Sequence, residues 1–120
     1  MLPRSQRLAS RREYAAVYGR RRGLAGTFLV LHHRARKEES LGERRFGFVA
    51  SRKVGKSHDR NRVKRRLRAI CRSMLPYLQS GVDFVVVARS GAAAATYEQL
   101  NGELEELARQ AGLLDAEGVQ

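Results

Sequence analysis

Apolar residues recur along this 120-residue chain with two periods, and each period predicts a kind of element. Between about Ser57 or Asp59 and about Tyr77, apolar side chains return about every 3.6 residues, the period of a helix with one buried face. The repeating positions are Val63, Leu67, Ile70, Cys71, Met74 and Leu78. Pro76 has no backbone N–H to donate to the Arg72 carbonyl, so we expect it to loosen or end the last turn.

Two shorter helices are predicted towards the ends of the chain. Ser10 and Glu13 have the spacing of a capping box, and the residues after them place three apolar or aromatic side chains on one face. That face holds Tyr14, Val17 and Tyr18. Thr96 and Gln99 repeat the capping pattern before a second apolar stripe. That stripe holds Leu100, Leu104, Leu107 and Ala111.

Three runs rich in β-branched and aromatic residues predict strands at 27–33, 45–53 and 83–89. In the second run, Phe46, Phe48 and Ala50 alternate with Gly47, Val49 and Ser51. We expect the first two strands to form an antiparallel pair joined by the charged loop 34–44. The third run is apolar without alternation, which is typical of a strand covered on both faces, so it should be central in the sheet.

The length and composition predict one domain over residues 1–120, because 42% hydrophobic side chains can form one modest core. We expect residues 1–9 to be a mobile basic arm and residues 113–120 a mobile tail. The single cysteine, Cys71, cannot form an internal disulfide, and no signal peptide opens the chain, so we expect a cytoplasmic protein. The apolar runs are far shorter than the roughly 20 residues of a membrane helix, so no membrane partner is expected.

The charge is strongly positive and unevenly distributed. Lysine and arginine number 24, against 12 aspartates and glutamates, which gives a formal net charge of +12. From Ala92 onward there are six acidic residues and one basic residue, so residues 1–91 hold 23 basic and six acidic ones. This excess favours a polyanionic partner bound by the first three quarters of the chain. Arginine dominates, and its planar fork of donors suits phosphates and stacks on bases.

The basic residues are densest between Arg52 and Arg68, where nine of seventeen positions are basic. On the predicted helix, four polar residues share a face opposite the apolar stripe, and two more flank them. The four are Asn61, Arg65, Arg68 and Arg72, and the flanking two are Arg62 and Lys64. The alternative is a merely solvated face, but such a face usually mixes charges, whereas Asp59 is the only acid here. The pattern therefore predicts phosphate binding.

The turn before this helix is a second candidate anion site. The first backbone N–H groups of a helix point outward at the positive end of its dipole. Arg52 and Lys56 are expected to add phosphate contacts there. The turn contains Gly55 but lacks the second glycine of a nucleotide-binding loop, so ATP binding is not predicted.

A self-sufficient nuclease would need its own acid, base or metal ligands. His32 and His33 are neighbours on a predicted strand and point to opposite faces, so they cannot act together on one phosphate. His58 beside Asp59 is better explained by the start of the helix, because a metal site needs three or more ligands. We therefore expect no catalytic residue, and no metal or cofactor bound by protein side chains.

Residues 45–72 resemble a known family. The segment reads RFGFVASRKVGKSHDRNRVKRRLRAICR: a strand ending in Ser-Arg-Lys-Val-Gly, a spacer, then Arg-Asn-Arg-x-Lys-Arg-x-x-Arg on a helix. It is similar to the motif of the bacterial ribonuclease P protein component. The matching positions are Ser51, Arg52, Lys53, Val54, Gly55, Arg60, Asn61, Arg62, Lys64, Arg65 and Arg68. The order of the other predicted elements extends the resemblance over roughly residues 4–112.

The resemblance implies the small protein subunit of a ribonucleoprotein endoribonuclease, a hydrolase that removes the 5′ leader of precursor tRNA. The implied fold is an α/β sandwich in the α+β class, with a mostly antiparallel sheet of about four strands and three helices, like the second domain of ribosomal protein S5. One protein would bind one ribonuclease P RNA. That RNA would hold the Mg²⁺ ions and the nucleophilic water.

The resemblance also assigns residues to two surfaces. The RNA subunit would be bound by Arg60, Asn61, Arg62, Lys64, Arg65, Arg68 and Arg72. The leader would lie in a cleft lined by Tyr14, Val17, Tyr18, Val49, Ser51 and Lys53. Tyrosine stands at positions 14 and 18 where the family usually has phenylalanine, and a phenol ring still stacks on bases. An accessory ribosomal or other RNA-binding protein is the alternative that composition alone leaves open.

Overall fold

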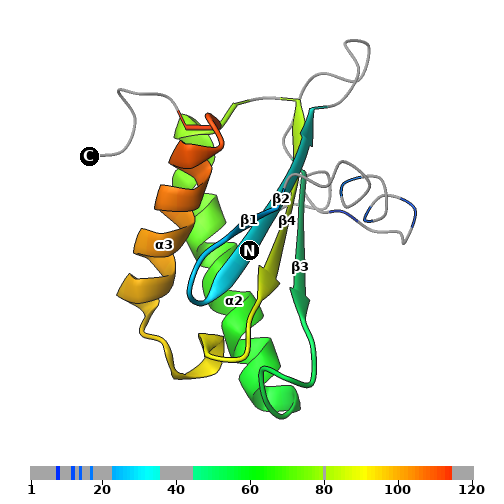
Figure 1. Ribbon diagram of the computed structural model, residues 1–120, viewed down its shortest axis with the longest axis vertical. Helices are drawn as coiled ribbons and strands as arrows, with labels where there is room; N and C mark the ends of the chain where they lie inside the picture. The colour runs from blue at the N-terminus through cyan, green and yellow to red at the C-terminus, as the bar shows by residue number, and fades with distance from the viewer. Residues whose placement is uncertain are drawn as a thin grey trace.

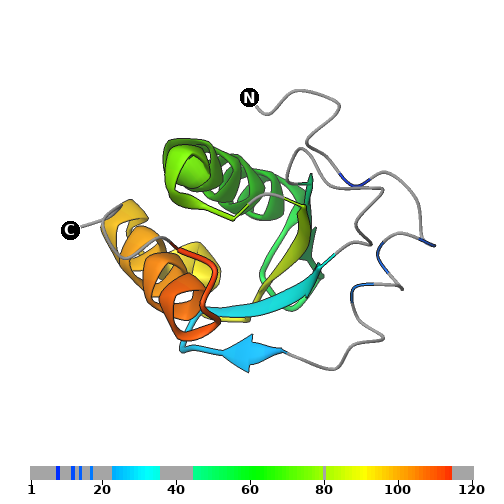
Figure 2. The ribbon, with the colours of Figure 1, turned by 90° about the horizontal axis from the view of Figure 1, so that it is seen from above.

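Two α-helices pack on one face of a four-stranded sheet (Figure 1). The computed structural model describes residues 8, 12, 14, 17, 23–35, 45–79 and 81–114. The strands are β1 (Leu24–Ala25), β2 (Leu29–Ala35), β3 (Arg45–Ala50) and β4 (Val82–Ala88). The α-helices are α2 (Ser57–Met74) and α3 (Tyr97–Gln110), and the short 3-10 helices are η3 (Leu75–Tyr77) and η4 (Ala92–Ala94). Figure 2 shows both long helices on the same side of the strands.

The mixed α+β class is confirmed, but the expected helix count is not. The described residues form two α-helices rather than three. Of the first predicted helix, only Arg12, Tyr14 and Val17 are described, and all three are helical. The predicted cap at Ser10 and Glu13 lies outside the described residues. The likeness to a ribosomal-protein domain stays a prediction.

The strand order is β1-β2-β4-β3, so β4 is central, as predicted. β4 pairs antiparallel with β2 and parallel with β3. The predicted antiparallel pairing of the first two long strands is therefore wrong. The physical reason is the crossover: α2 follows β3 and returns the chain to the same end of the sheet, so β4 enters parallel to β3 and separates it from β2.

The helices follow their sequence signals closely. All the apolar positions predicted for the long helix are buried, from Val63 to Leu78. The α-helix ends at Met74 and continues as one 3-10 turn containing Pro76, which agrees with the expected loosening. Thr96 caps α3 in a complete capping box with Gln99, as predicted.

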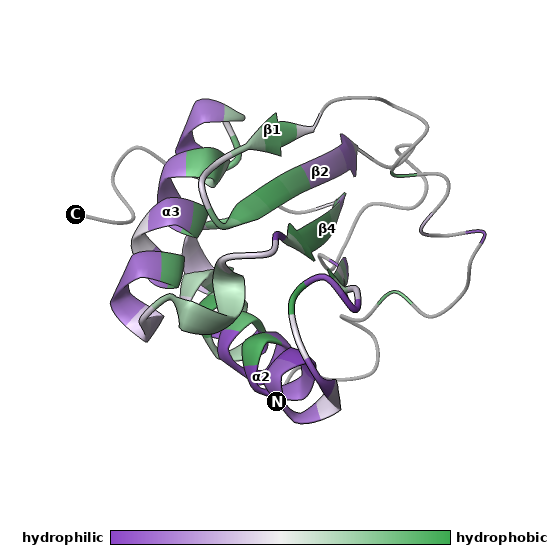
Figure 3. Cartoon of the chain, turned by 60° about the horizontal axis from the view of Figure 1, so that its bottom comes forward, coloured by the Kyte–Doolittle hydropathy of each residue, from purple (hydrophilic) through white to green (hydrophobic). Residues whose placement is uncertain are grey.

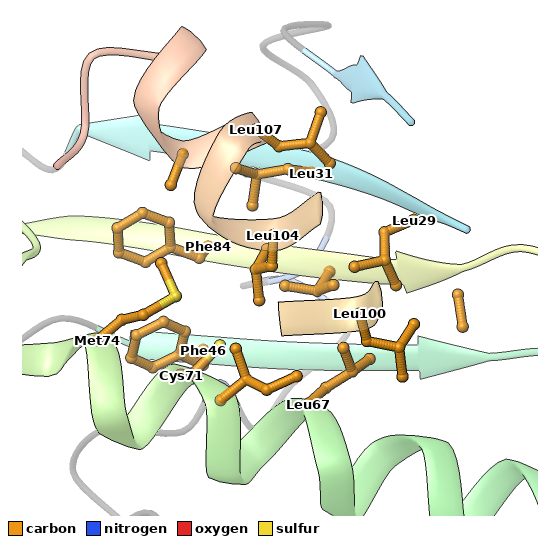
Figure 4. Close-up of a cluster of buried hydrophobic side chains, with 14 of the residues drawn as sticks. Leu29, Leu31, Phe46, Leu67, Cys71, Met74, Phe84, Leu100, Leu104 and Leu107 are labelled. Carbon is orange, nitrogen blue, oxygen red and sulfur yellow. The ribbon is translucent and has the colours of Figure 1, made fainter. Parts of the chain in front are cut away.

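The main core lies between the sheet and the two helices (Figure 4). Side chains from β2, β3 and β4 meet the apolar stripes of α2 and α3 there. Glu103 joins α3 to the start of β2: its carboxylate accepts hydrogen bonds from the backbone N–H groups of Thr27, Phe28 and Leu29 at 2.8, 2.8 and 2.7 Å. The acidic last helix is thus a structural support of the sheet.

A smaller cluster covers the other face of the sheet, formed by Leu8, Val17 and Val85. The Leu8 N–H donates to the Phe46 carbonyl at 2.7 Å, so this residue of the expected mobile arm is attached to β3. Leu113, expected in a mobile tail, is also buried, and its carbonyl accepts from the Gln79 N–H at 3.0 Å. The rest of both segments, apart from Leu114, lies outside the described residues.

Within the described parts of the chain, no helix has the length and apolar character needed to cross a membrane.

Candidate nucleic-acid interface

Helix α2 separates apolar from cationic side chains along its whole length. Val63, Leu67 and Ile70 are completely buried against the sheet, while Asn61, Arg65 and Arg72 are exposed. Figure 3 shows α2 as a largely hydrophilic helix with hydrophobic bands. The helix therefore presents its basic residues on a face that the sheet anchors from behind.

Six of the seven basic residues of α2, all except Arg60, fall into two groups that the sequence did not distinguish. Arg62 and Arg66 are half-buried and point towards η4, where their guanidinium groups donate to the Ala93 carbonyl at 3.2 Å and the Ala95 carbonyl at 3.1 Å. Arg62 also lies 3.4 Å from the Asp59 carboxylate. Part of the donor capacity of Arg62 is therefore used within the protein, because the η4 segment brings a carbonyl acceptor to its side of the helix.

The second group keeps its donors available. Among the described residues, no hydrogen bond or ion pair involves its side chains, and all of them lie on or beside the outward face of α2. The group consists of Lys64, Arg65, Arg68 and Arg72, and we call it the cationic ridge. Arg68 also contacts the sheet, with its guanidinium carbon 5.9 Å from the centre of the Phe48 ring. The ridge is where a phosphate backbone can be bound without first breaking contacts within the protein.

The turn between β3 and α2 presents more cations. Two of its backbone N–H groups form hydrogen bonds within the turn. Val54 donates to the Ser51 carbonyl at 3.0 Å and Gly55 to the Arg52 carbonyl at 3.2 Å. Buried Val54 anchors the turn, and its polar neighbours face solvent. The exposed residues are Ser51, Arg52, Lys53 and Lys56. Gly55 has a φ of +150°, a backbone conformation that other residues rarely adopt, so glycine is needed to direct the chain into α2.

Lys56 occupies the N-cap of α2, and no side chain caps the helix there. Arg60 donates to the Ser57 hydroxyl at 3.2 Å, and Asp59 lies in the first turn. Asp59 partly offsets the positive charge at this end. The predicted anion site at the helix start therefore has exposed basic side chains, and it also contains the carboxylate of Asp59.

The described residues among those assigned to a leader cleft lie on the sheet face opposite the two helices, or at its end. Val49 is half-buried, and Ser51 and Lys53 are exposed. Tyr14 is half-buried with its ring against Gly47, where an added Cβ would overlap the ring. Val17 has no exposed surface and packs in the small cluster with Leu8 and Val85. Tyr18 lies outside the described residues.

Comparison with known proteins decides the family. The profile of the family described as Ribonuclease P matches residues 2–112. The chain is 38% identical over 117 residues to the ribonuclease P protein component of Symbiobacterium thermophilum, covering 98% of this chain and 100% of the relative. The chain belongs to the ribonuclease P protein family. The protein component from Syntrophomonas wolfei is 34% identical, covering 94% of this chain and 92% of its own length.

Solved structures of the ribonuclease P protein family share this fold. The protein from Staphylococcus aureus superposes with a TM-score of 0.81 at 23% identity, covering 92% of this chain and 98% of that one. The protein from Thermotoga maritima superposes with a TM-score of 0.71 at 27% identity, covering 86% of this chain and 96% of that one. The recognised motif thus lies within an architecture that other family members possess.

Burial affects the protonation of two side chains in this ribonuclease P family member. Burial raises the pKa of the Cys71 thiol, which keeps it protonated in the core. Burial also lowers the pKa of His32, which favours its neutral form. The described residues contain no group of three or more His, Cys, Asp or Glu side chains arranged to hold a metal ion.

Sequence reasoning missed one ionic cluster on the sheet. Asp83 is completely buried on β4 and accepts from Arg45 at 2.9 Å through each of its two oxygens. Arg34 lies 3.5 Å from the same carboxylate. The sequence signal was a lone aspartate at the start of an otherwise apolar strand, which is costly to bury unless it is paired.

Proposed function

We propose that this chain is the protein subunit of ribonuclease P and that the cationic ridge of α2 binds the catalytic RNA subunit. The observation that carries the proposal is the ridge itself: four basic side chains that make no polar contact with the described residues, on a helix whose opposite face is completely buried. Each phosphate bound there would release counterions, which makes such binding strongly dependent on salt. Membership of the family supports an RNA partner.

The opposite face of the sheet is the proposed site for the 5′ leader of precursor tRNA. Half-buried Tyr14 and Val49 offer a surface for unpaired bases, and exposed Lys53 can approach the backbone phosphates at its end. In this proposal the two RNAs contact different faces of one small domain. One protein per ribonuclease P RNA is sufficient for this arrangement.

Hydrolysis of the leader is assigned to the RNA subunit, with Mg²⁺ ions held by that RNA. The protein contributes positive charge close to two RNAs, which lowers the repulsion between their phosphate backbones. A neutralising protein should therefore reduce the concentration of Mg²⁺ that cleavage requires.

Reconstitution tests this function directly. The purified chain is added to the ribonuclease P RNA of Symbiobacterium thermophilum, and cleavage of precursor tRNA is followed over a series of Mg²⁺ concentrations. We expect the chain to lower the Mg²⁺ needed for half-maximal cleavage. If that requirement stays unchanged while the chain binds ribosomal RNA equally well, it is an accessory RNA-binding protein of another kind.

Two neighbouring arginines provide a matched pair for the ridge. Replacing exposed Arg65 with alanine should leave the melting temperature unchanged and reduce the slope of log K against log salt by roughly 1. Replacing Arg66, which donates to the Ala95 carbonyl, should instead lower the free energy of unfolding by about 1 kcal/mol. Filter binding to the RNA subunit and thermal melts followed by circular dichroism measure the two effects. An unchanged affinity and slope for the Arg65 variant would contradict the proposed ridge.

The leader site predicts a difference between two RNAs. Replacing Tyr18 with alanine should weaken binding of precursor tRNA by about 1 to 3 kcal/mol, the energy of one base stacked on an aromatic ring. Binding of mature tRNA, which has no leader, should hardly change. Tyr18→Phe is the control, because it keeps the stacking face. An equal loss for both tRNAs would assign the tyrosine to the fold instead of the leader site.

A further inference from the structure

Three phenylalanine rings on β3 and β4 contact one another in sequence, Phe84 to Phe46 across the strands and Phe46 to Phe48 along β3. The rings of Phe84 and Phe46 are 5.0 Å apart with their planes 14° from parallel, and those of Phe46 and Phe48 are 6.2 Å apart with planes 7° from parallel. Phe84 and Phe46 are buried, whereas Phe48, on edge strand β3, is half-buried. The Phe48 ring therefore packs on the buried Phe46 ring, which in turn packs on the buried Phe84 ring.

Arg68, on α2, packs over the ring of Phe48. Its guanidinium carbon lies over the Phe48 ring at 5.9 Å from the centroid, within the range of a cation–π contact. This contact uses the face of the ring and none of the five N–H donors of the guanidinium. Those donors make no hydrogen bond to the described residues, in contrast to the donors that Arg62 and Arg66 give to η4.

We propose that Phe48 is a positioning residue that holds the guanidinium of Arg68 ready to bind an RNA phosphate. The inference rests on the proposed function of the cationic ridge. A free arginine side chain loses rotamer freedom when it is immobilised at an interface, and a contact that already orders it removes part of that cost. An ordered guanidinium also presents its planar fork for bidentate contact with a phosphate.

The test is a double-mutant cycle on Phe48 and Arg68. Phe48→Leu keeps an apolar side chain at the edge of the core but removes the ring, and Phe48→Met is a second ring-free variant if leucine packs poorly. Phe48→Tyr keeps the ring. Each is combined with Arg68 and with Arg68→Ala, and the affinity and salt dependence of binding to the ribonuclease P RNA of Symbiobacterium thermophilum are measured. Thermal melts set a temperature at which every variant used is folded.

We expect Phe48→Leu to weaken RNA binding by roughly 2- to 10-fold, the range that corresponds to ordering one side chain. The salt slope should stay unchanged, because the same phosphates are contacted. Phe48→Tyr should bind as the unmodified protein does. In the Arg68→Ala background, Phe48→Leu should have no further effect, since the group that it positions has been removed.

Three results would overturn the inference, and they show whether the proposed ridge fails with it. If Arg68→Ala weakens binding but Phe48→Leu does not, or if Phe48→Leu weakens it equally in both backgrounds, Phe48 does not act through Arg68 and the ridge itself still stands. If Arg68→Ala changes neither affinity nor salt slope, Arg68 contacts no phosphate, and both this inference and its part of the ridge are wrong.

Discussion

Replacing Leu67 with alanine is expected to lower the free energy of unfolding by about 2 to 5 kcal/mol. Leu67 has no exposed surface and lies in the middle of α2, packed into the main core (Figure 4). Truncation removes its contacts and leaves a cavity that a helix fixed against a sheet can only partly close. Because small domains have roughly 5 to 15 kcal/mol of stability in total, the loss should be evident in urea unfolding followed by circular dichroism.

The matched control for Leu67 is Arg65→Ala, which removes a larger side chain from the outward face of the same helix. The control should unfold at the same urea concentration as the unmodified protein, because surface substitutions usually change stability by less than about 0.5 kcal/mol. Equal urea midpoints for both variants would contradict the orientation of α2, and with it the outward direction of the cationic ridge.

Replacing Asp83 with alanine is expected to cost about 3 kcal/mol of stability. The carboxylate is completely buried, and Arg45 donates to both of its oxygens. Its removal leaves the arginine side chains on this face without their shared counter-charge, while water reaches them only in part, since the side chain of Arg45 is 27% exposed. Urea unfolding at neutral pH measures the loss.

The double variant Asp83→Leu with Arg45→Leu is the control for this cluster. Removing charge from both partners should recover much of the stability, since an apolar pair avoids the cost of burying ions. If Asp83→Ala has the same stability as the unmodified protein, the carboxylate contributes nothing to holding β4 against β3.

The sequence predicted correctly those features that depend on residues close together along the chain. The apolar period of α2, the turn at Pro76 and the Thr96 cap are local features, and all three are confirmed. The pairing of β2 with β4 depends on residues about fifty positions apart, and no local pattern distinguishes it from a hairpin between consecutive strands.

The same limit applies to the candidate site. Helical geometry gives the direction of Arg62 from α2, but the carbonyl of Ala93 that it contacts comes from a loop thirty-one residues later. Periodicity therefore placed Arg62 and Arg65 in one group, although only Arg65 keeps its donors available. Likewise, the alternation in β3 predicted which face Phe48 occupies, but not that Arg68 would lie over its ring.

The central position of β4 constrains how this protein folds while it is synthesised. When residues 29–50 have left the ribosome, the described part of the chain made so far offers β2 the two-residue β1 and offers β3 no long strand to pair with. The ladders that β2 and β3 form with β4 must wait until Val82–Ala88 emerges, and Glu103 arrives later still to accept hydrogen bonds from the N–H groups at the start of β2. Completion of the sheet is therefore a late event in synthesis, and the basic nascent chain must stay soluble without it.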